Sequence, residues 1–194
     1  MGRPQTISDE EILESARECF FDHGPSVATE VIAERLGVSP QALYKRFGSK
    51  RNLMTAAMLP CTAPGWIRLV ESGPDDRPMQ EQLVEFLNEL AVFFVDIVRR
   101  MSVLRFAGCD LRELSKRFTE PPPVRDIRVI SEWFERAHQR GLIRQADYKA
   151  TAMMLLSALH GPAMIQEMLG RHPTGQSQED YVAHVADVLL RGLK

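Results

Sequence analysis

The sequence predicts an all-α fold: an N-terminal three-helix head that contains a helix-turn-helix, followed by a C-terminal helical bundle. Apolar residues recur at three- and four-residue spacing along most of the 194 residues, and no segment shows convincing strand character. Serine and threonine stand where helices would begin, and glycines where they would end. We place the domain boundary so that residues 1–59 form the head and residues 60–194 the bundle.

The head carries several helix-start signals. Ser8 and Glu11 fit a capping box ahead of a first helix over residues 8–22. Two helices of about two turns, joined by a Gly-Val-Ser turn, then make a helix-turn-helix, and a further helix links the head to the bundle. We expect Thr29, Ser39 and Ser49 to cap these three helices, with Pro40 at the first position of the middle one and Gly37 and Gly48 as stops.

Longer amphipathic helices are predicted beyond a connecting stretch over residues 71–78. Gly161-Pro162 falls inside one of them, and a proline there removes a backbone hydrogen bond and crowds the preceding turn. We therefore predict a kink or a break at this point. The predicted helices span residues 79–100, 102–115, 123–140, 147–170 and 178–193.

Charge is distributed unevenly along the head. The segment from Ile7 to Glu34 is strongly acidic, whereas the segment from Arg35 to Val70 has six basic residues and no acidic one. The basic segment, in a chain whose formal net charge is only -2, predicts a local positive surface. Binding of a polyanion is the first hypothesis for this surface.

The outward face of the helix that begins at Pro40 has the residue types that read DNA. Gln41 can form two hydrogen bonds with adenine, and Ala42 can contact a thymine methyl group. Tyr44 can donate its hydroxyl to a phosphate, and Lys45 and Arg46 supply positive charge for phosphates. Leu43 and Phe47 on the opposite face are expected to be core residues.

Residues 28–50 closely resemble the head of the tetracycline-repressor (TetR) family. The shared features are an Ile-Ala pair, a Gly-Val-Ser turn, a Leu-Tyr-x-x-Phe motif and a following Ser-Lys pair. The motif-level resemblance covers residues 7–58; Lys45-Arg46 departs from it, because many relatives carry aromatic residues or histidine there. The resemblance implies a homodimer, usually a repressor, that binds a near-palindromic double-stranded DNA operator. The implied DNA contacts are Arg3, Thr29, Ser39, Pro40, Gln41, Ala42, Tyr44, Lys45, Arg46 and Lys50.

The resemblance also implies an effector pocket in the bundle and a dimer interface on its last two helices. The chain has nine methionines and nine phenylalanines, which favours a deformable apolar interior for a small hydrophobic effector. The pocket candidates are Phe86, Phe93, Phe94, Met101, Phe106, Trp133, Phe134, Met153 and Met154. The interface candidates are Leu156, His160, Met164, Tyr181, Val185, Val188 and Leu189.

An alternative hypothesis is an all-α small-molecule-binding protein or enzyme in which the N-terminal helices are only structural. The sequence offers this alternative little support, because no Gly-x-Ser-x-Gly elbow, phosphate loop or dinucleotide fingerprint occurs. Glu135 and His138 form a single Glu-x-x-His motif, whereas a di-iron bundle needs two. We expect no cofactor, no metal and no membrane span. Cys19, Cys61 and Cys109 are widely spaced, which favours reduced thiols in a cytosol and leaves the roles of the last two open.

Overall fold

The computed structural model describes residues 7–59 and 64–193, and every regular element in these two ranges is an α-helix. The all-α prediction is therefore confirmed. The chain divides into two compact units, one built from residues 1–62 and 99–111 and the other from residues 63–98 and 112–194. No helix in the described ranges has the length and apolar character needed to cross a bilayer.

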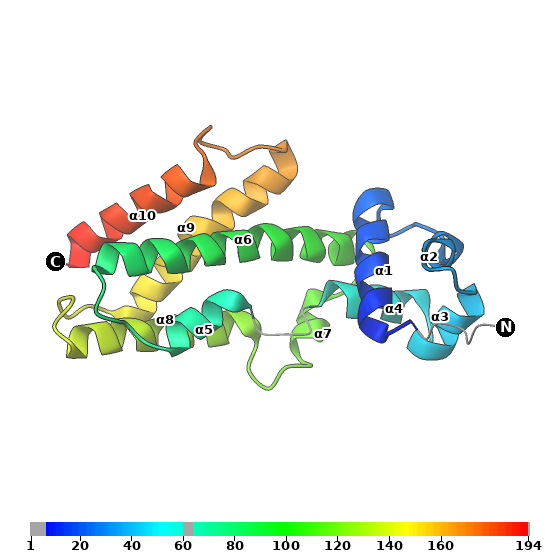
Figure 1. Ribbon diagram of the computed structural model, residues 1–194, viewed down its shortest axis with the longest axis horizontal. Helices are drawn as coiled ribbons and strands as arrows, with labels where there is room; N and C mark the ends of the chain where they lie inside the picture. Colours follow the sequence, from blue (N-terminus) through cyan, green and yellow to red (C-terminus); the bar gives the residue numbers. More distant parts are fainter. Residues whose placement is uncertain (1–6, 60–63, 194) are drawn as a thin grey trace. The chain divides into compact units, whose positions relative to one another are not determined.

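The first unit contains four short helices and the end of a long one (Figure 1). The predicted capping box is present, because the Ser8 hydroxyl accepts from the Glu11 N–H and the Glu11 carboxylate accepts from the Ser8 N–H. The core of this unit includes Ile12, Ala16, Cys19, Phe20, Ile32, Leu43, Leu53 and Ala57. The helices are α1 (Asp9–His23), α2 (Thr29–Leu36), α3 (Pro40–Phe47) and α4 (Lys50–Met58).

Two polar contacts attach neighbouring elements to α1. The Arg17 Nε donates to the Ala57 carbonyl on α4 at 2.9 Å. The Arg99 guanidinium, from the end of the long helix, lies 4.0 Å from the centre of the Phe21 ring, a cation–π contact. The last turns of that helix therefore belong to the first unit.

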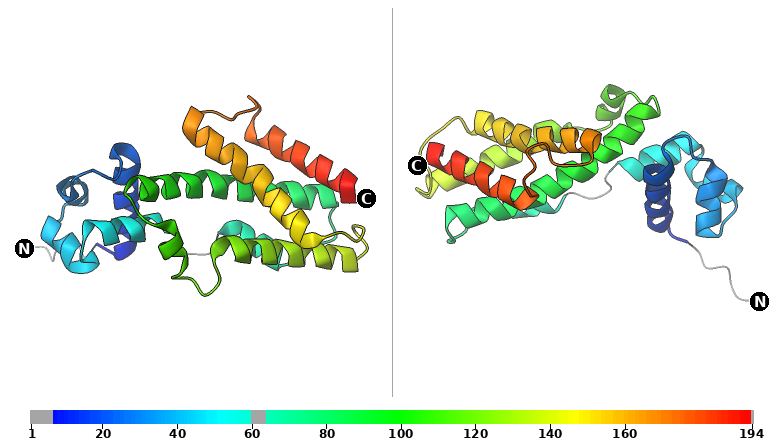
Figure 2. Two further views of the ribbon diagram at one scale, coloured as in Figure 1. Left: turned by 180° about the vertical axis from the view of Figure 1, so that it is seen from behind. Right: turned by 90° about the horizontal axis from the view of Figure 1, so that it is seen from above.

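The second unit is a bundle in which α9 and α10 lie side by side, joined by a loop (Figures 1 and 2). Its core combines apolar side chains from five helices, α5, α6, α8, α9 and α10. The elements are α5 (Gly65–Glu71), α6 (Met79–Phe106), α7 (Leu111–Ser115), α8 (Pro122–Gln139), α9 (Tyr148–Leu169) and α10 (Gln178–Leu193).

Helix α5 was not among the predicted helices, and two sequence predictions about helices are wrong. The helix predicted to end at residue 100 continues to Phe106, because its apolar pattern passes through Met101 without a breaker. The helix predicted over residues 102–115 is divided by Gly108, which has a positive φ of 70° that ends α6 and leaves α7 as a short separate turn.

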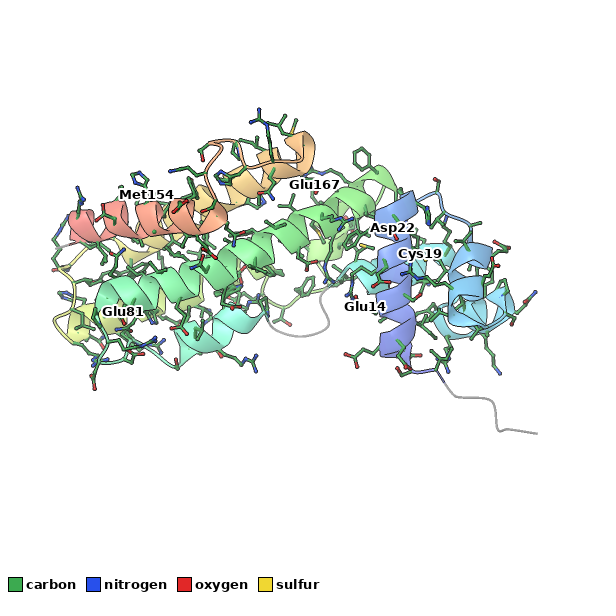
Figure 3. The ribbon with its side chains drawn as sticks, turned by 45° about the horizontal axis from the view of Figure 1, so that its top comes forward. Glu14, Cys19, Asp22, Glu81, Met154 and Glu167 are labelled. Atoms are coloured by element: carbon green, nitrogen blue, oxygen red, sulfur yellow. The ribbon has the colours of Figure 1, made fainter. Side chains whose placement is uncertain are left out.

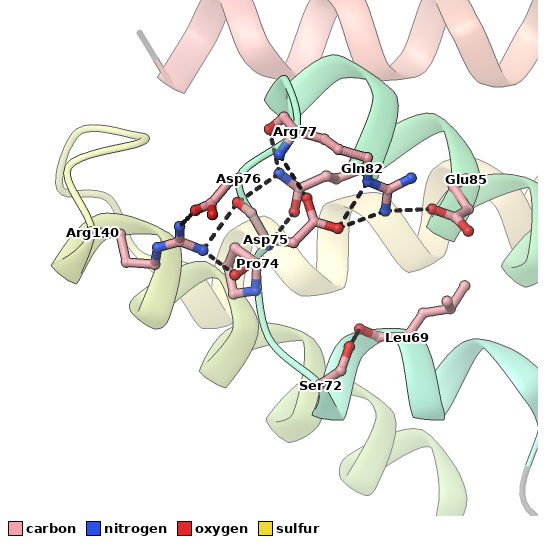
Figure 4. A network of polar contacts seen from close by, with 9 residues as sticks. All are labelled: Leu69, Ser72, Pro74, Asp75, Asp76, Arg77, Gln82, Glu85 and Arg140. Carbon is pink, nitrogen blue, oxygen red and sulfur yellow. Dashed lines mark hydrogen bonds and ion pairs between the residues drawn. The ribbon is translucent and has the colours of Figure 1, made fainter.

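The link between α5 and α6 is held by a polar network (Figure 4). The Gln82 amide accepts from the Asp75 N–H at 2.8 Å and donates to the Arg77 carbonyl at 2.6 Å. Arg77 in turn pairs with Asp75 and Glu85, and Arg140 at the end of α8 donates to the Asp75 carbonyl at 3.0 Å. A stretch rich in glycine and proline is thus ordered by side chains, because it has no helical hydrogen bonds of its own.

Pro162 does not break α9, which runs without interruption from Tyr148 to Leu169. A proline lacks the N–H that would bond the carbonyl four residues earlier, which here belongs to Ala158. The Tyr181 hydroxyl from α10 donates to that same Ala158 carbonyl at 2.8 Å. The orphaned acceptor is therefore satisfied by the neighbouring helix, and of the two predicted outcomes the break is excluded.

The bond from Tyr181 to Ala158 predicts a coupling with Pro162. Tyr181→Phe should lower the free energy of unfolding by about 1 kcal/mol, since it leaves a partly buried carbonyl without a donor. In a Pro162→Ala background the same substitution should cost less, because the new N–H at residue 162 can bond the Ala158 carbonyl within the helix. A double-mutant cycle by urea denaturation measures this difference. Equal costs in the two backgrounds would contradict the assignment.

Candidate nucleic-acid interface

One buried side chain determines the orientation of α3. Leu43 is only 1% exposed and packs into the core of the first unit. Because Leu43 faces inward, Gln41, Ala42 and Lys45 lie on the opposite side of the helix and are exposed. The Ser39 hydroxyl accepts from the Ala42 N–H at 3.2 Å, which secures the first turn of the helix beside Pro40, as predicted.

Tyr44 is held in place by Thr29 from the start of α2. The Tyr44 hydroxyl donates to Thr29 Oγ1 at 3.0 Å, while the ring stays 43% exposed. Thr29 itself is 3% exposed, so the prediction that its side chain clamps a phosphate is corrected: it positions Tyr44 instead. Its expected capping role is also wrong, because Ala28 occupies the N-cap position and Thr29 is the first helical residue. As α2 has no side-chain cap, the N–H groups of its first turn lack a side-chain acceptor.

The positive charges at the interface differ in how far they are already paired. The Arg46 guanidinium donates to the Ile7 carbonyl at 2.6 Å and pairs with Asp9 at 3.2 Å. Asp9 therefore partly neutralises Arg46 in the protein without DNA, and the phosphate contact expected of Arg46 stays a prediction. Lys45 is exposed and makes no ion pair with any described residue, and Lys50 is half-buried at the first position of α4.

Arg35 also turns away from α3. Its guanidinium contacts the Cys19 sulfur at 3.8 Å and pairs with Glu18 and Asp22 on α1. The Cys19 contact first, and then the two carboxylates, raise the pKa of Arg35. Figure 3 shows Cys19 and Asp22 on α1. One predicted DNA-contacting residue, Arg3, lies outside the described part of the chain. Of the two cysteines whose roles were left open, Cys61 also lies outside it and Cys109 is buried.

The predicted pocket residues separate into two groups. Phe86, Phe94, Trp133 and Phe134 are buried in the second unit, while Phe93 and Met101 are half-buried. Three others face solvent, which corrects their assignment to a pocket: Phe106 is 84% exposed, Met153 52% and Met154 60% (Figure 3 labels Met154). Sequence reasoning also missed Trp66 of α5, whose ring packs against Phe86 and Phe93 at centroid distances of 6.0 and 6.2 Å. The available signal was a tryptophan in a segment, between residue 60 and the connecting stretch over residues 71–78, to which no element was assigned.

The predicted interface residues also separate by exposure. Leu156 and Leu189 are buried within the protomer, so their assignment to a dimer interface is corrected. Tyr181 and Val185 are half-buried, whereas His160, Met164 and Val188 are exposed. Although the residue is exposed overall, partial desolvation of its imidazole, which contacts the Phe94 ring, lowers the pKa of His160 from its usual value. The exposed apolar residues of α9 that the sequence analysis did not assign to this interface are Met153, Met154, Ile165, Met168 and Leu169.

An outward-facing second helix of a helix-turn-helix, with a lysine and a glutamine on its exposed side, defines the class of DNA-binding regulatory proteins. The comparisons place the chain within this class. The family description "Bacterial regulatory proteins, tetR family" matches residues 12–57, and "AefR-like transcriptional repressor, C-terminal domain" matches residues 83–192. The chain belongs to the TetR family and is a DNA-binding transcriptional regulator.

Individual relatives agree with this assignment. The chain is 31% identical over 168 residues to the HTH-type transcriptional repressor BdcR of Escherichia coli, a match that covers 81% of each protein. It is 45% identical over 56 residues to the HTH-type transcriptional repressor AcnR of Corynebacterium glutamicum, which covers 28% of this chain and 30% of AcnR.

Solved structures show the same fold. A TetR-family regulator from Mesorhizobium loti has a TM-score of 0.71 at 21% identity, with 95% of this chain and 93% of that one covered. NalD, the secondary repressor of a multidrug efflux pump in Pseudomonas aeruginosa, has a TM-score of 0.64 at 21% identity, with 95% and 94% covered.

The pairing of Arg46 with Asp9 predicts an inhibitory effect of that carboxylate on DNA affinity. Asp9→Asn should release Arg46 for a phosphate and make the slope of log affinity against log salt steeper by about 0.9. Fluorescence anisotropy with a short duplex over a salt series measures the slope. Glu10→Gln is the matched control, because it removes the same charge from the same turn of α1 without touching Arg46. If the two variants have the same slope, the Asp9 contact does not restrain Arg46.

Proposed function

We propose that the protein is a homodimeric repressor that places α3 of each protomer in the major groove of a near-palindromic operator. The observation that carries this proposal is the anchoring of α3 by Leu43, which leaves Gln41, Ala42 and Lys45 exposed on one side. Gln41 and Ala42 supply base-edge contacts, and Lys45 supplies a phosphate contact; a phosphate contact from Tyr44 requires that its hydroxyl proton leave Thr29 Oγ1. Two protomers related by a two-fold axis would place their recognition helices about 34–36 Å apart, or a multiple of that distance.

The dimer is proposed to form through α9 and α10. Between Ala150 and Ile165, α9 contains no aspartate, glutamate, lysine or arginine, and its outer side carries exposed methionines. A helix that is apolar on all sides normally has partners on all sides. The bundle of one protomer covers only the inner side, where Leu155 and Leu159 are buried. On the outer side of α9, the small residues Ser157 and Gly161 would let a second copy approach closely.

The repressor is proposed to be released by a small apolar effector bound among the buried aromatic residues of the second unit. Such an effector would favour a state in which the two heads are wrongly spaced for the operator. Linkage then requires that operator DNA weaken effector binding by the same factor by which effector weakens DNA binding.

Gel retardation on the DNA upstream of the protein's own gene tests the operator proposal. The protein should retard this fragment, and Lys45→Ala should weaken binding and lower the salt slope by about 0.9, since one phosphate contact is lost. Lys149→Ala is the matched control, because it removes an exposed lysine from α9 and should leave the slope unchanged. If no upstream fragment is retarded at low salt, the protein does not bind DNA in the proposed way.

Sedimentation velocity tests the dimer proposal. The protein should sediment as a dimer, and Met164→Glu should shift it to a monomer, because a buried unpaired carboxylate opposes association. Val124→Glu, at an exposed apolar position on α8, places the same charge elsewhere and should leave the dimer intact. A dimer that survives Met164→Glu, or that Val124→Glu disrupts equally, would exclude this face.

A further inference from the structure

Thr29 and Tyr44 join the two helices of the helix-turn-helix through a pair of hydroxyl groups. Thr29 is the first residue of α2 and is 3% exposed, whereas Tyr44 on α3 is 43% exposed. Their hydroxyl oxygens lie 3.0 Å apart. A β-branched side chain such as threonine has few rotamers, and burial restricts Thr29 further. The Thr29 hydroxyl is therefore a fixed point beside which the Tyr44 oxygen is held.

Tyr44 lies at the edge of the face that α3 exposes. Leu43 points into the core, and successive residues of a helix are rotated by about 100°. Tyr44 is therefore placed between the buried side and the side that carries Gln41 and Lys45. When a helix lies in a major groove, the side chains at its centre reach base edges, and those on its flank face the sugar–phosphate backbone. A phosphate is thus the group that the Tyr44 hydroxyl meets on DNA.

The hydroxyl pair can form its hydrogen bond in either direction, because each hydroxyl has one hydrogen and can also accept. In the protein without DNA, Tyr44 donates to Thr29 Oγ1, as expected of the more acidic phenol. A phosphate oxygen is a stronger acceptor than a threonine hydroxyl, because it carries negative charge. A phosphate beside Tyr44 therefore accepts the Tyr44 hydrogen, and the Thr29 hydroxyl turns to donate to the Tyr44 oxygen. Two hydroxyl hydrogens rotate, and no covalent bond forms or breaks.

We infer that Thr29 is a positioning residue for DNA binding, which donates to the Tyr44 oxygen while Tyr44 donates to a phosphate of the duplex. This inference rests on the proposed placement of α3 in the major groove and names the residue that controls one of its phosphate contacts. Thr29 is too deeply buried to contact the phosphate itself. It holds the Tyr44 oxygen in place before DNA binds, which reduces the conformational freedom lost on binding. Its hydrogen bond also polarises the phenol, which strengthens the bond from Tyr44 to the phosphate.

A double-mutant cycle on DNA affinity tests the inference with the full-length protein. The DNA is a labelled duplex selected from a random-sequence library for binding to the unmodified protein, and fluorescence anisotropy gives its affinity. Tyr44→Phe should weaken binding about tenfold for each half-site, the effect of one hydrogen bond to a charged group. Thr29→Val should weaken it about two- to fivefold, because Tyr44 keeps its hydrogen but loses its support. In the Tyr44→Phe background, Thr29→Val should have no further effect. An unchanged affinity in Thr29→Val, or an equal loss in both backgrounds, would overturn the inference.

Two further variants separate positioning from packing. Thr29→Ser keeps the hydroxyl and should keep the unmodified affinity. Thr55→Val makes the same change at another buried threonine of the first unit, 7% exposed, and should leave the affinity unchanged. None of these variants removes a charge, so the slope of log affinity against log salt should not change. A loss in Thr29→Ser or in Thr55→Val as large as that in Thr29→Val would refute the positioning role.

Ethylation interference on the same duplex gives a readout that altered packing would not move. Ethylation removes the charge of one phosphate at a time, and ethylation of the phosphate that Tyr44 contacts should weaken binding of the unmodified protein. Tyr44→Phe should abolish this interference at one phosphate in each half-site, and Thr29→Val should reduce it at the same phosphate. An unchanged pattern in both variants, or changes at different phosphates, would contradict the inference.

The outcomes distinguish this inference from the operator proposal. Failure to select any duplex would overturn the operator proposal and the inference together. A selected duplex whose binding is unaffected by Tyr44→Phe and Thr29→Val would overturn the inference alone, because α3 would then be placed on DNA without this contact.

Discussion

Burial of Leu43 is the interaction on which the candidate interface depends. The recognition helix has two turns and contributes one fully buried side chain to the core, so this contact determines its rotation. The caps at Ser39 and Ser49 hold the helices that follow them, and the bond from Tyr44 to Thr29 fixes the one aromatic side chain on the exposed face. A small, rigid head of this kind can present base-reading side chains with little conformational freedom to lose on binding, which favours specific recognition.

A second constraint acts in the bundle, where α9 is apolar on both its inner and outer sides. Its inner side packs on the core, and its carbonyl at Ala158 is bonded by Tyr181 because Pro162 cannot bond it. The α9–α10 pair is thereby stabilised within one protomer before any partner is present. The outer side remains apolar, and a pre-formed helix pair with an apolar outer side is a suitable surface for a symmetric interface.

Much of the head could be predicted from sequence because its signals are local. Capping residues act within one turn of the helix that they start, and the pattern of apolar residues in α1 and α3 identifies their buried sides. Local signals do not show where a side chain has a distant partner. The roles expected for Thr29 and Arg46 depended on free functional groups, and the folded chain brings Tyr44 to the first and Asp9 to the second. The same limitation explains why Leu156 and Leu189 were assigned to the dimer interface, because helical spacing alone could not distinguish them from exposed neighbours.

The sequence by itself determined the helical class, the helix-turn-helix and the family, because these follow from short-range spacing, caps and a contiguous motif over residues 28–50. Tertiary structure alone decided which charges are paired, how α9 continues through Pro162, and that Trp66 is buried against the aromatic rings of α6. The physical reason is that hydrogen bonding and burial depend on groups that lie far apart in the chain and meet only in the folded protein. Periodicity shows which face of a helix is apolar, but it cannot show what that face will meet.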